Sequence, residues 1–321
     1  MTGILSHSAD PAYNLATEEF LLKNKKDDVF FIYINRPGII VGKHQNTLAE
    51  INYSYILKNN IPVFRRLSGG GTVYHDLGNL NFCFITNEEK GSLVDFDKHS
   101  TPIVKALESL GLNITVGKRH NLSINGKKIT GTASHVYKQR AMHHGTLLFS
   151  ADLTVLTKCL NADYKKYSGK GVKSVKSEVT NISGHLKNEM SMKEFTTYIF
   201  NFLMSYFQDA RSYHFSEKEI SEINDLADKK YSRWEWNYGY SPVYEIERSI
   251  NAGNITISSH IKVEKGLIKT LKFDTSDKTL DQSLKNLSSA LLNIQHSKSA
   301  INSAIANNSI LPHEQLFRLM F

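Results

Sequence analysis

A run of twelve residues with three consecutive glycines, Arg65 to Asp76, constrains this chain more than any other segment; it reads RRLSGGGTVYHD. Glycine has no Cβ, so the backbone can turn sharply and present successive N–H groups to an anion. Arg65 and Arg66 can add bidentate, charge-assisted hydrogen bonds to phosphate or carboxylate. The spacing matches neither the lysine-containing phosphate loop nor the dinucleotide fingerprint. The segment predicts an anion-binding loop, with an ordinary glycine-rich hairpin turn as the alternative.

A second segment predicts a β-hairpin. Asn125-Gly126 is flanked by alternating polar and apolar residues, which is typical of a two-residue turn. Pairing outward from this turn places Ser123 opposite Lys128. Because side chains alternate along a strand, one face of the hairpin is apolar and the other polar. The apolar face carries Leu122, Ile124 and Ile129, and the polar face carries Asn121, Ser123, Lys128 and Thr130. Lys128, rather than Lys127, is therefore the candidate site residue; the alternative is that both are solvated charges at the hairpin tip.

Taken together, these segments and two further motifs resemble the lipoate–protein ligase family. The family pattern Arg-Arg-x-Ser-Gly-Gly-Gly-x-Val-aromatic-His-Asp matches residues 65–76. Gly-Asn follows at residues 78–79, and Lys-[Ile/Val]-[Ser/Thr]-Gly-[Ser/Thr]-Ala matches residues 128–133. His-His-Gly-Thr-Leu-Leu matches residues 143–148. The similarity covers nearly all of residues 1–240 in one consistent order, and several motifs in register are more specific than any single one.

The resemblance implies an enzyme with two half-reactions. ATP, Mg²⁺ and (R)-lipoate first give lipoyl-AMP and pyrophosphate. A lysine of an acceptor protein then attacks the adenylate and forms an amide. The implied acceptors are the lipoyl domains of 2-oxoacid dehydrogenase E2 subunits and the glycine cleavage H protein. Negative charge concentrates at the α-phosphorus in the first transition state, so a fixed cation and preorganised N–H groups suit the reaction.

The resemblance also implies roles for individual residues. Lys128 is the catalytic cation and contacts both the lipoyl carbonyl and the adenylate phosphate. The implied ATP and adenylate contacts are Arg66, Gly69, Gly70, Gly71, Thr72, Val73, Tyr74, Asn79 and Lys128. The implied lipoate contacts are Lys128, Ser68, His75, Gly131, Thr132, His144 and Gly145.

Several of these assignments have alternatives. His75 either contacts the ligand or orients the loop through a backbone hydrogen bond. Asn79 either positions the adenylate or caps a turn. His143 and His144 are adjacent in a predicted strand, so at most one faces the ligand, and a structural histidine is the alternative for each. The apolar slot for lipoate has four candidate wall residues: Leu67, Tyr33, Val73 and Phe82.

One position departs from the family pattern. Many members read Arg-Asn-Asp-Leu where this chain reads Arg119-His120-Asn121-Leu122. Magnesium prefers hard anionic oxygens, so Asn121 is a weaker metal ligand than the aspartate it replaces. Either ATP supplies most of the magnesium coordination, or adenylation is weakened while acyl transfer is not.

Other functions remain as alternatives. Related octanoyl- and amidotransferases work through a cysteine thioester, which needs an activated thiolate; here only Cys83 and Cys159 are available. A lipoyl or octanoyl transferase that accepts a preformed activated donor would share every motif above. A non-catalytic sensor of lipoate or nucleotide would not need a cation between two reacting groups.

Composition agrees with a globular enzyme. The chain has 321 residues, 40% hydrophobic and 22% charged, and its length suggests two domains. No apolar run of about 18 residues predicts a membrane span. The first residues show no signal-peptide pattern, and two cysteines argue against a disulfide framework, so a cytoplasmic protein is expected.

The net charge of +8 has three interpretations. The charge could indicate nucleic-acid binding, but no recognition motif accompanies it. It could also belong to a solvated surface without a specific role. An acidic protein partner is favoured by the resemblance, because charge complementarity speeds encounter. The lysine-rich stretch from Lys165 to Lys176 is expected either to be a mobile surface loop or to order over the adenylate as a lid.

The expected fold class is α+β, with a mixed or largely antiparallel sheet, because helices and strands do not alternate strictly. The family implies the fold that biotin–protein ligases share. A helix after Asp10 is expected to be amphipathic. A boundary at Ser241-Pro242 predicts a catalytic domain over residues 1–242 and a small α+β accessory domain over residues 243–321. A monomer is expected.

Overall fold

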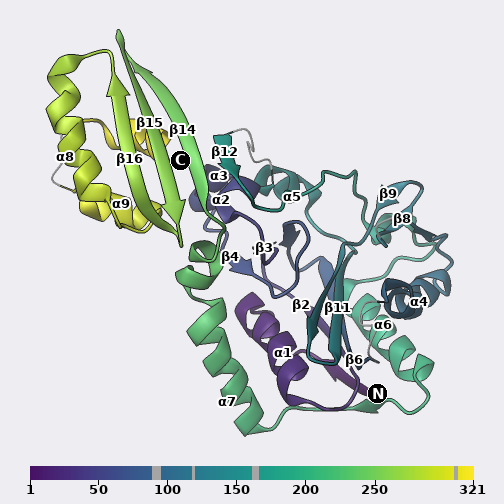
Figure 1. Ribbon diagram of the computed structural model, residues 1–321. Coiled ribbons are helices and arrows are strands. Elements are labelled where there is room, and N and C mark those ends of the chain that lie inside the picture. Colours follow the sequence, from purple (N-terminus) through teal and green to yellow (C-terminus); the bar gives the residue numbers. More distant parts are fainter. Residues whose placement is uncertain (89–94, 118–119, 161–165, 307–309) are drawn as a thin grey trace.

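The computed structural model describes residues 1–88, 95–117, 120–160, 166–306 and 310–321. A six-stranded mixed sheet forms the centre of the larger part of the molecule (Figure 1). Its strands lie in the order β10 (Thr132–Tyr137), β11 (Arg140–Leu148), β6 (Asn79–Asn87), β2 (Val29–Ile34), β1 (Thr2–Leu5) and β13 (Arg211–Ser212). β1 pairs in parallel with β2 and β13, and the other pairs are antiparallel. This matches the expected α+β class.

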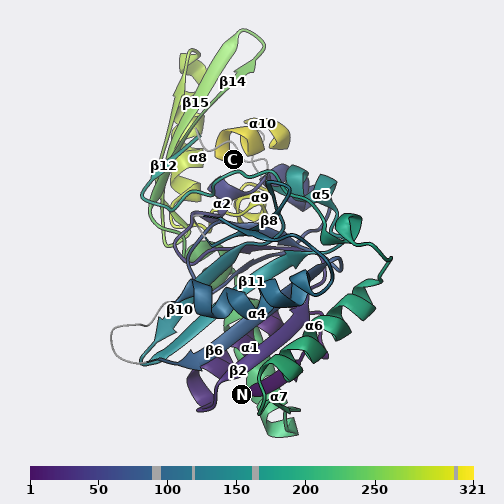
Figure 2. The same cartoon turned by 90° about the vertical axis from the view of Figure 1, so that its right-hand side faces the viewer.

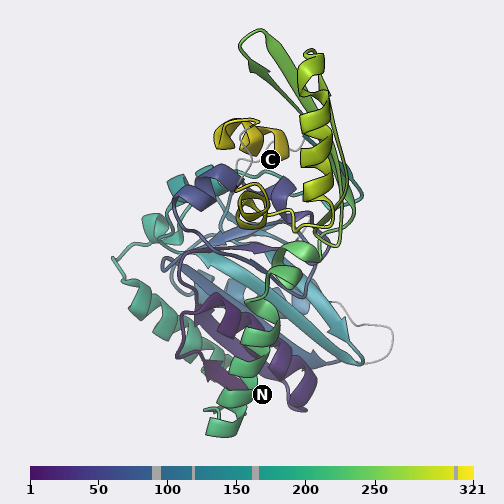
Figure 3. The same cartoon turned by 90° about the vertical axis from the view of Figure 1, so that its left-hand side faces the viewer.

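Both faces of the large sheet are covered. Helices α4 (Phe96–Glu108) and α6 (Met192–Tyr206) cover one face (Figure 2), and α1 (Pro11–Asn24), with α7 (Glu217–Leu226) packed behind it, covers the other (Figure 3). Phe30 and Ile32 pack toward α4 and α6, whereas Phe31 packs toward α1. This explains why Val29–Ile34 is an unbroken apolar run: a strand with two covered faces has no solvent side.

Helix α1 begins where the sequence predicts but is buried more completely. The Asp10 side chain accepts hydrogen bonds from the backbone nitrogens of Ala12, at 2.8 Å, and Tyr13, so it is the N-cap, with Pro11 in the first turn. The expectation of an amphipathic helix is wrong, because twelve consecutive residues from Pro11 are buried. The helix lies between the sheet on one side and α7 with the π-helical turn η3 (Ala227–Tyr231) on the other.

Two small sheets carry the sequence motifs. One has the order β4 (Val63–Arg65), β3 (Gly38–Val41) and β5 (Val73–His75); the other has the order β7 (Thr115–Val116), β8 (Leu122–Ile124) and β9 (Lys127–Lys128). The glycine triplet connects β4 to β5. The β8–β9 hairpin has the predicted register, with Ser123 opposite Lys128. Asn125 and Gly126 have φ of 50° and 77°, as a two-residue turn requires.

The C-terminal residues form a second sheet with its own helices. The sheet has the order β12 (Tyr167–Gly169), β14 (Tyr244–Ala252), β15 (Ile255–Glu264) and β16 (Leu267–Thr275). The helices are α8 (Asp281–Leu291), α9 (Lys298–Ala304) and α10 (His313–Met320). β12 comes from the lysine-rich stretch, which was expected to be a mobile surface loop or a lid over the adenylate; its residues 167–169 pair antiparallel with β14. Lys165 lies outside the described residues.

Four short elements lie between the two parts: α2 (Thr47–Glu50), α3 (Tyr53–Lys58), α5 (Leu153–Cys159) and the turn η4 (Glu235–Gly239). The turn η2 (Ile182–His185) packs with α4 and α6, and η5 (Lys278–Leu280) precedes α8. One hydrophobic cluster runs from Ile39 and Leu48 to Ile246 and Leu319, so the two parts pack together. Among the described residues, no helix is long and apolar enough to cross a membrane.

Candidate active site

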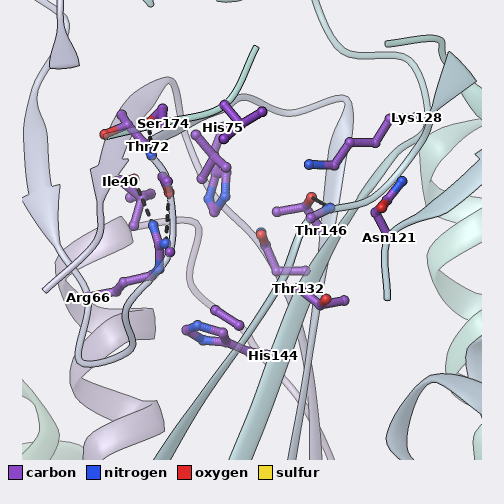
Figure 4. A pocket seen from close by; sticks show the side chains of 18 of the residues that line it. Ile40, Arg66, Thr72, His75, Asn121, Lys128, Thr132, His144, Thr146 and Ser174 are labelled. Carbon is purple, nitrogen blue, oxygen red and sulfur yellow. Dashed lines mark hydrogen bonds between the residues drawn. The ribbon is translucent and has the colours of Figure 1, made fainter. Parts of the chain in front are cut away.

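A cavity with two lobes lies beside the glycine triplet (Figure 4). The first lobe has a volume of about 370 Å³ and the second about 250 Å³. Leu15, Tyr33 and Ile40 line only the first lobe, and Leu148, Leu156 and Leu160 line only the second. Both lobes are lined by Thr72, Val73, Lys128, Gly131, Thr146, Ser174, Val175 and Ser177. The cavity can therefore hold two chemical groups side by side, with their junction at these shared residues.

Lys128 lies at the junction of the lobes. Its position is set by main-chain bonds: the backbone nitrogen of Lys128 donates to Glu178 O at 2.9 Å, and Thr180 N donates to Lys128 O at 3.0 Å. A Cβ built on Gly131 would lie 3.7 Å from Lys128 Nζ, so the glycine leaves room for the ammonium group. In Figure 4 Lys128 and Arg66 enter the cavity from opposite sides. The lysine can therefore contact groups in both lobes.

Arg66 holds the shape of the glycine loop. Its Nη2 donates to Gly69 O at 2.6 Å and to Gly71 O at 2.7 Å, while Nη1 donates to Ile40 O at 3.0 Å. Gly70 has φ of 86°, a conformation that strongly favours glycine. Burial lowers the pKa of Arg66 to about 10, which leaves the side chain charged at neutral pH. Arg66 therefore places a positive charge at the first lobe, and its N–H groups stabilise the conformation of the glycine loop.

A strap, residues 172–177, crosses the same loop. Ser174 Oγ accepts a hydrogen bond from Thr72 N at 2.8 Å and from Gln45 Nε2 at 3.1 Å, and it donates to Glu50. A Cβ on Gly71 would lie 3.0 Å from this hydroxyl. The backbone N–H of Thr72, which was predicted to bind phosphate, therefore donates to a side-chain hydroxyl in this structure.

His75 presents a neutral hydrogen-bond donor to the first lobe. Asn14 Nδ2 donates to Asn35 Oδ1 at 2.8 Å, so the amide nitrogen of Asn35 faces His75 Nδ1 at 3.0 Å. That contact makes Nδ1 an acceptor and places the ring proton on Nε2. Burial lowers the pKa of His75 to about 3. Nε2 is buried and has no hydrogen-bond partner among the described residues, and His75 lines the first lobe.

His144 also lines the first lobe, whereas Ser68 lies behind it. Ser68 Oγ is 2.5 Å from His144 Nε2, and Arg66 Nε donates to the same oxygen at 3.0 Å. His144 Nδ1 is 2.9 Å from Glu18 Oε2. Ser68 is only 1% exposed and is absent from the lining of both lobes. His143 points to the opposite face of the sheet, where its ring stacks on His99 at 3.9 Å.

The other predicted residues divide between the lobes and their surroundings. The first lobe is lined by Gly70, Gly71, Asn121, Thr132 and Gly145, and the second by Tyr74. Gly69 and Asn79 are absent from both linings. Asn79 Nδ2 donates to Asn81 Oδ1 at 3.0 Å, and Asn81 lines the first lobe in its place. Of the four candidate wall residues, Tyr33 and Val73 line the cavity, whereas Leu67 and Phe82 do not.

Asn121 offers one amide oxygen to a metal. Its Nδ2 donates to Ser123 Oγ at 3.3 Å, which leaves the carbonyl oxygen for another partner. No group of three or more histidine, cysteine, aspartate or glutamate side chains that could hold a metal occurs among the described residues. A magnesium ion here would take most of its oxygen ligands from a bound phosphate and water. Arg119, in the same motif, lies outside the described residues.

Some residues at the cavity belong to no sequence motif. Gln45 and Glu50 follow β3 and hold the strap, while Leu156 and Leu160 join Leu148 in the apolar wall of the second lobe. Glu50 is 2% exposed. An acidic residue in a short helix and two leucines at ordinary spacing carry no chemical signature, so only their position identifies them.

Neither cysteine is suited to nucleophilic catalysis. Cys83 and Cys159 are both buried. Burial raises the pKa of Cys83 well above its ordinary value and that of Cys159 to about 11. Both thiols therefore stay protonated at neutral pH.

Comparisons with known proteins point to one family. Residues 10–203, more than half of the chain, match the family model described as the lipoyl protein ligase A/B catalytic domain. Lipoate–protein ligase 1 of Staphylococcus aureus is 37% identical over 324 residues, which cover 97% of each chain. A structure of a bipartite lipoate protein ligase, studied with its E2 lipoyl domain from Thermoplasma acidophilum, is 26% identical with a TM-score of 0.64. It covers 74% of this chain and 96% of that one. A lipoate–protein ligase A bound with ATP is 27% identical with a TM-score of 0.63, covering 75% of this chain and 100% of that one.

Proposed function

The chain belongs to the lipoate–protein ligase family, and from that premise we propose that its two-lobed cavity makes lipoyl-AMP and transfers the lipoyl group to a protein lysine. The observation that carries this assignment is the position of Lys128 at the junction of the lobes. A reaction that joins a carboxylate to a phosphate needs a cation where the two anions meet, because they repel each other. Lys128 is that cation in our proposal.

In the first step, a lipoate carboxylate oxygen attacks the α-phosphorus of ATP, and the bond to pyrophosphate breaks. Lys128 neutralises the carboxylate and the α-phosphate as they approach, and the N–H groups of the glycine loop stabilise the phosphate oxygens. A magnesium ion bound with ATP would supply further charge neutralisation to the leaving pyrophosphate. The residues present suit a magnesium ion held mainly by the nucleotide, with Asn121 as one amide ligand.

We assign the lipoyl chain to the first lobe and the nucleotide base to the second. Leu15, Ile40 and Tyr33 give the first lobe apolar walls for an alkyl chain and dithiolane ring. His75 Nε2–H supplies a neutral donor there. The leucines of the second lobe suit the face of a purine ring.

In the second step, the ε-amine of the acceptor lysine attacks the lipoyl carbonyl, AMP leaves, and the amine loses a proton. Lys128 polarises the carbonyl in this step as well. The cationic and apolar rim formed by Lys170, Lys173, Lys176, Val172 and Val175, all exposed, suits an acidic acceptor domain. We propose lipoyl domains of E2 subunits and the glycine cleavage H protein as the acceptors.

A transferase that accepts a preformed activated donor is the second candidate. The observation that favours it is Asn121, whose amide replaces the carboxylate common in the family. A transferase that works through a cysteine thioester is disfavoured, because both cysteines are buried and their pKa values are raised.

We also propose the division into a catalytic domain, residues 1–242, and an accessory domain, residues 243–321, with β12 crossing between them. An accessory domain packed onto the catalytic part supports a monomer. Two cysteines, both free, are compatible with a cytoplasmic enzyme.

The decisive experiment is lipoate-dependent exchange of pyrophosphate into ATP, with Mg²⁺ and without acceptor protein. Exchange would establish that the chain makes its own lipoyl-AMP. Absence of exchange from folded protein, combined with transfer from supplied lipoyl-AMP, would establish the second candidate instead.

A further inference from the structure

Helix α1 buries a carboxylate directly behind the cavity. Glu18 is 1% exposed and lies in the middle of the helix. Its Oε1 accepts a hydrogen bond from Tyr33 Oη at 2.9 Å, and its two oxygens lie 3.0 and 2.9 Å from His144 Nδ1. A buried carboxylate is costly unless its charge is compensated and its oxygens are hydrogen-bonded. The burial of Glu18 therefore requires a compensating positive charge nearby.

With a neutral His144 ring, the hydrogen bonds around Glu18 have one consistent direction. A carboxylate only accepts, so His144 Nδ1 carries the proton that faces Glu18. In the neutral ring, Nε2 is then an acceptor. Ser68 Oγ, which already accepts from Arg66 Nε, gives its own proton to His144 Nε2. The bonds run in sequence from Arg66 through Ser68 and His144 to Glu18.

This sequence of bonds joins a buried cation to a buried anion. Arg66 and Glu18 attract each other electrostatically, and no other carboxylate acts on Arg66 in this way among the described residues. Arg66 in turn holds the carbonyl oxygens of Gly69 and Gly71. Displacing any link would weaken the contact of Ser68 with Arg66 Nε, one of the contacts that hold the guanidinium against the glycine loop.

We propose that Glu18 is a positioning residue for nucleotide binding: acting through His144 and Ser68, it holds Arg66 and so fixes the glycine loop. The inference rests on the proposed function of that loop. Ser68 is consequently a link between two side chains and not a nucleophile, because its oxygen is enclosed and lines neither lobe. Glu18 itself lines neither lobe, so it acts through other residues.

The neighbouring Glu19 provides a matched control. It is also buried, at 2%, on the same helix, but it binds Lys23 at 2.5 Å, Lys230 at 2.7 Å and Tyr231 at 2.7 Å, away from the cavity. Glu19→Gln removes a buried charge without touching His144. We expect it to lower the melting temperature and to leave ligand affinities unchanged.

The test measures ATP and lipoate dissociation constants by titration calorimetry. Glu18→Gln should weaken ATP binding at least about tenfold, the scale of one charge-assisted hydrogen bond, and change lipoate binding less than about twofold. Ser68→Ala should have the same effect. The double variant should be no worse than either single one, because both cut the same connection.

Two results would overturn the proposal. Weaker lipoate binding with unchanged ATP binding would make Glu18 part of the acid-binding lobe. Additive effects in the double variant would show that Glu18 and Ser68 act separately. If Glu18→Gln does not fold, Ser68→Ala alone decides, since unchanged ATP affinity in that variant excludes the connection. Absence of pyrophosphate exchange by the wild-type protein would instead reject the ligase function. The binding measurements do not depend on that activity, so the two failures can be distinguished.

Discussion

The hydroxyl of Ser174 accepts a hydrogen bond from the backbone nitrogen of Thr72 at 2.8 Å, across a separation of about a hundred residues in sequence. The Thr72 N–H belongs to the glycine loop proposed to bind phosphate. Because one N–H group makes one strong hydrogen bond at a time, a phosphate oxygen at this position has to displace the serine. The strap and the nucleotide therefore compete for the same donor.

Replacement of Ser174 by alanine should tighten ATP binding. The competing hydrogen bond is lost from the free enzyme only, and one such bond contributes about 1 kcal/mol, so the dissociation constant should fall roughly two- to tenfold. Titration calorimetry with ATP measures it, with Ser168→Ala, at an exposed position of strand β12 before the strap, as control. A weaker affinity would instead mean that the Ser174 hydroxyl supports the bound state.

Replacement of Lys128 by alanine should abolish adenylation and leave the fold intact. Removal of one preorganised charge-stabilising donor costs about 10²- to 10³-fold in rate, and Lys128 is only partly buried. Lys127→Ala is the matched control, because Lys127 lies next to it on the hairpin with its side chain exposed. Pyrophosphate exchange and a melting curve test both variants; near-normal exchange in Lys128→Ala would reject the central assignment.

Replacement of Asn121 by aspartate should reduce the magnesium requirement. A carboxylate is a stronger magnesium ligand than an amide, so the Mg²⁺ concentration for half-maximal exchange should fall severalfold. Asn121 lines the first lobe together with Lys128. The measurement is a magnesium titration at fixed ATP. An unchanged half-saturation point would place the metal away from residue 121.

Acid should destabilise the protein through its buried histidines. Burial lowers the pKa of His75 and of His143 to about 3, and that of His296 to about 4. The unfolded chain binds these protons near pH 6.5, so the stabilisation is complete above that pH and is lost as the pH falls toward the folded values. Each such residue adds up to about 1.4 kcal/mol per pH unit to the slope.

His143 allows this slope to be dissected. Neither of its ring nitrogens has a hydrogen-bond partner among the described residues, and its ring lies against His99 and Phe96. His143→Phe should keep the packing and make the dependence of unfolding free energy on pH shallower between pH 6.5 and 4. Denaturant unfolding at several pH values measures this dependence. An unchanged slope would show that His143 takes up no proton when the protein unfolds.

The sequence predicts secondary structure most accurately where it depends on a few neighbouring residues. The Asn125-Gly126 turn and the alternation around it define the register that places Lys128 opposite Ser123. Asp10 and Pro11 mark the start of α1. Each depends on a few consecutive residues, whose backbone preferences act before any tertiary contact forms.

Predictions fail where distant segments meet. The lysine-rich stretch was expected to be a mobile surface loop or a lid, and no strand was expected in it. Residues 167–169 nevertheless pair with β14, because the unpaired edge of a sheet is a template for another strand. Helix α1 was expected to have a solvent side, which α7 and η3 cover.

The sequence by itself determined the family, the glycine loop and the candidate lysine, because motifs and short-range periodicity record local backbone chemistry. Only the tertiary structure decided which residues meet around them: Glu18 behind His144, Ser174 on Thr72, and Asn81 in the place expected for Asn79. The reason is physical. Burial and pairing of polar groups depend on contacts between residues far apart in the chain, and a buried carboxylate or hydroxyl has the same letter in the sequence as an exposed one.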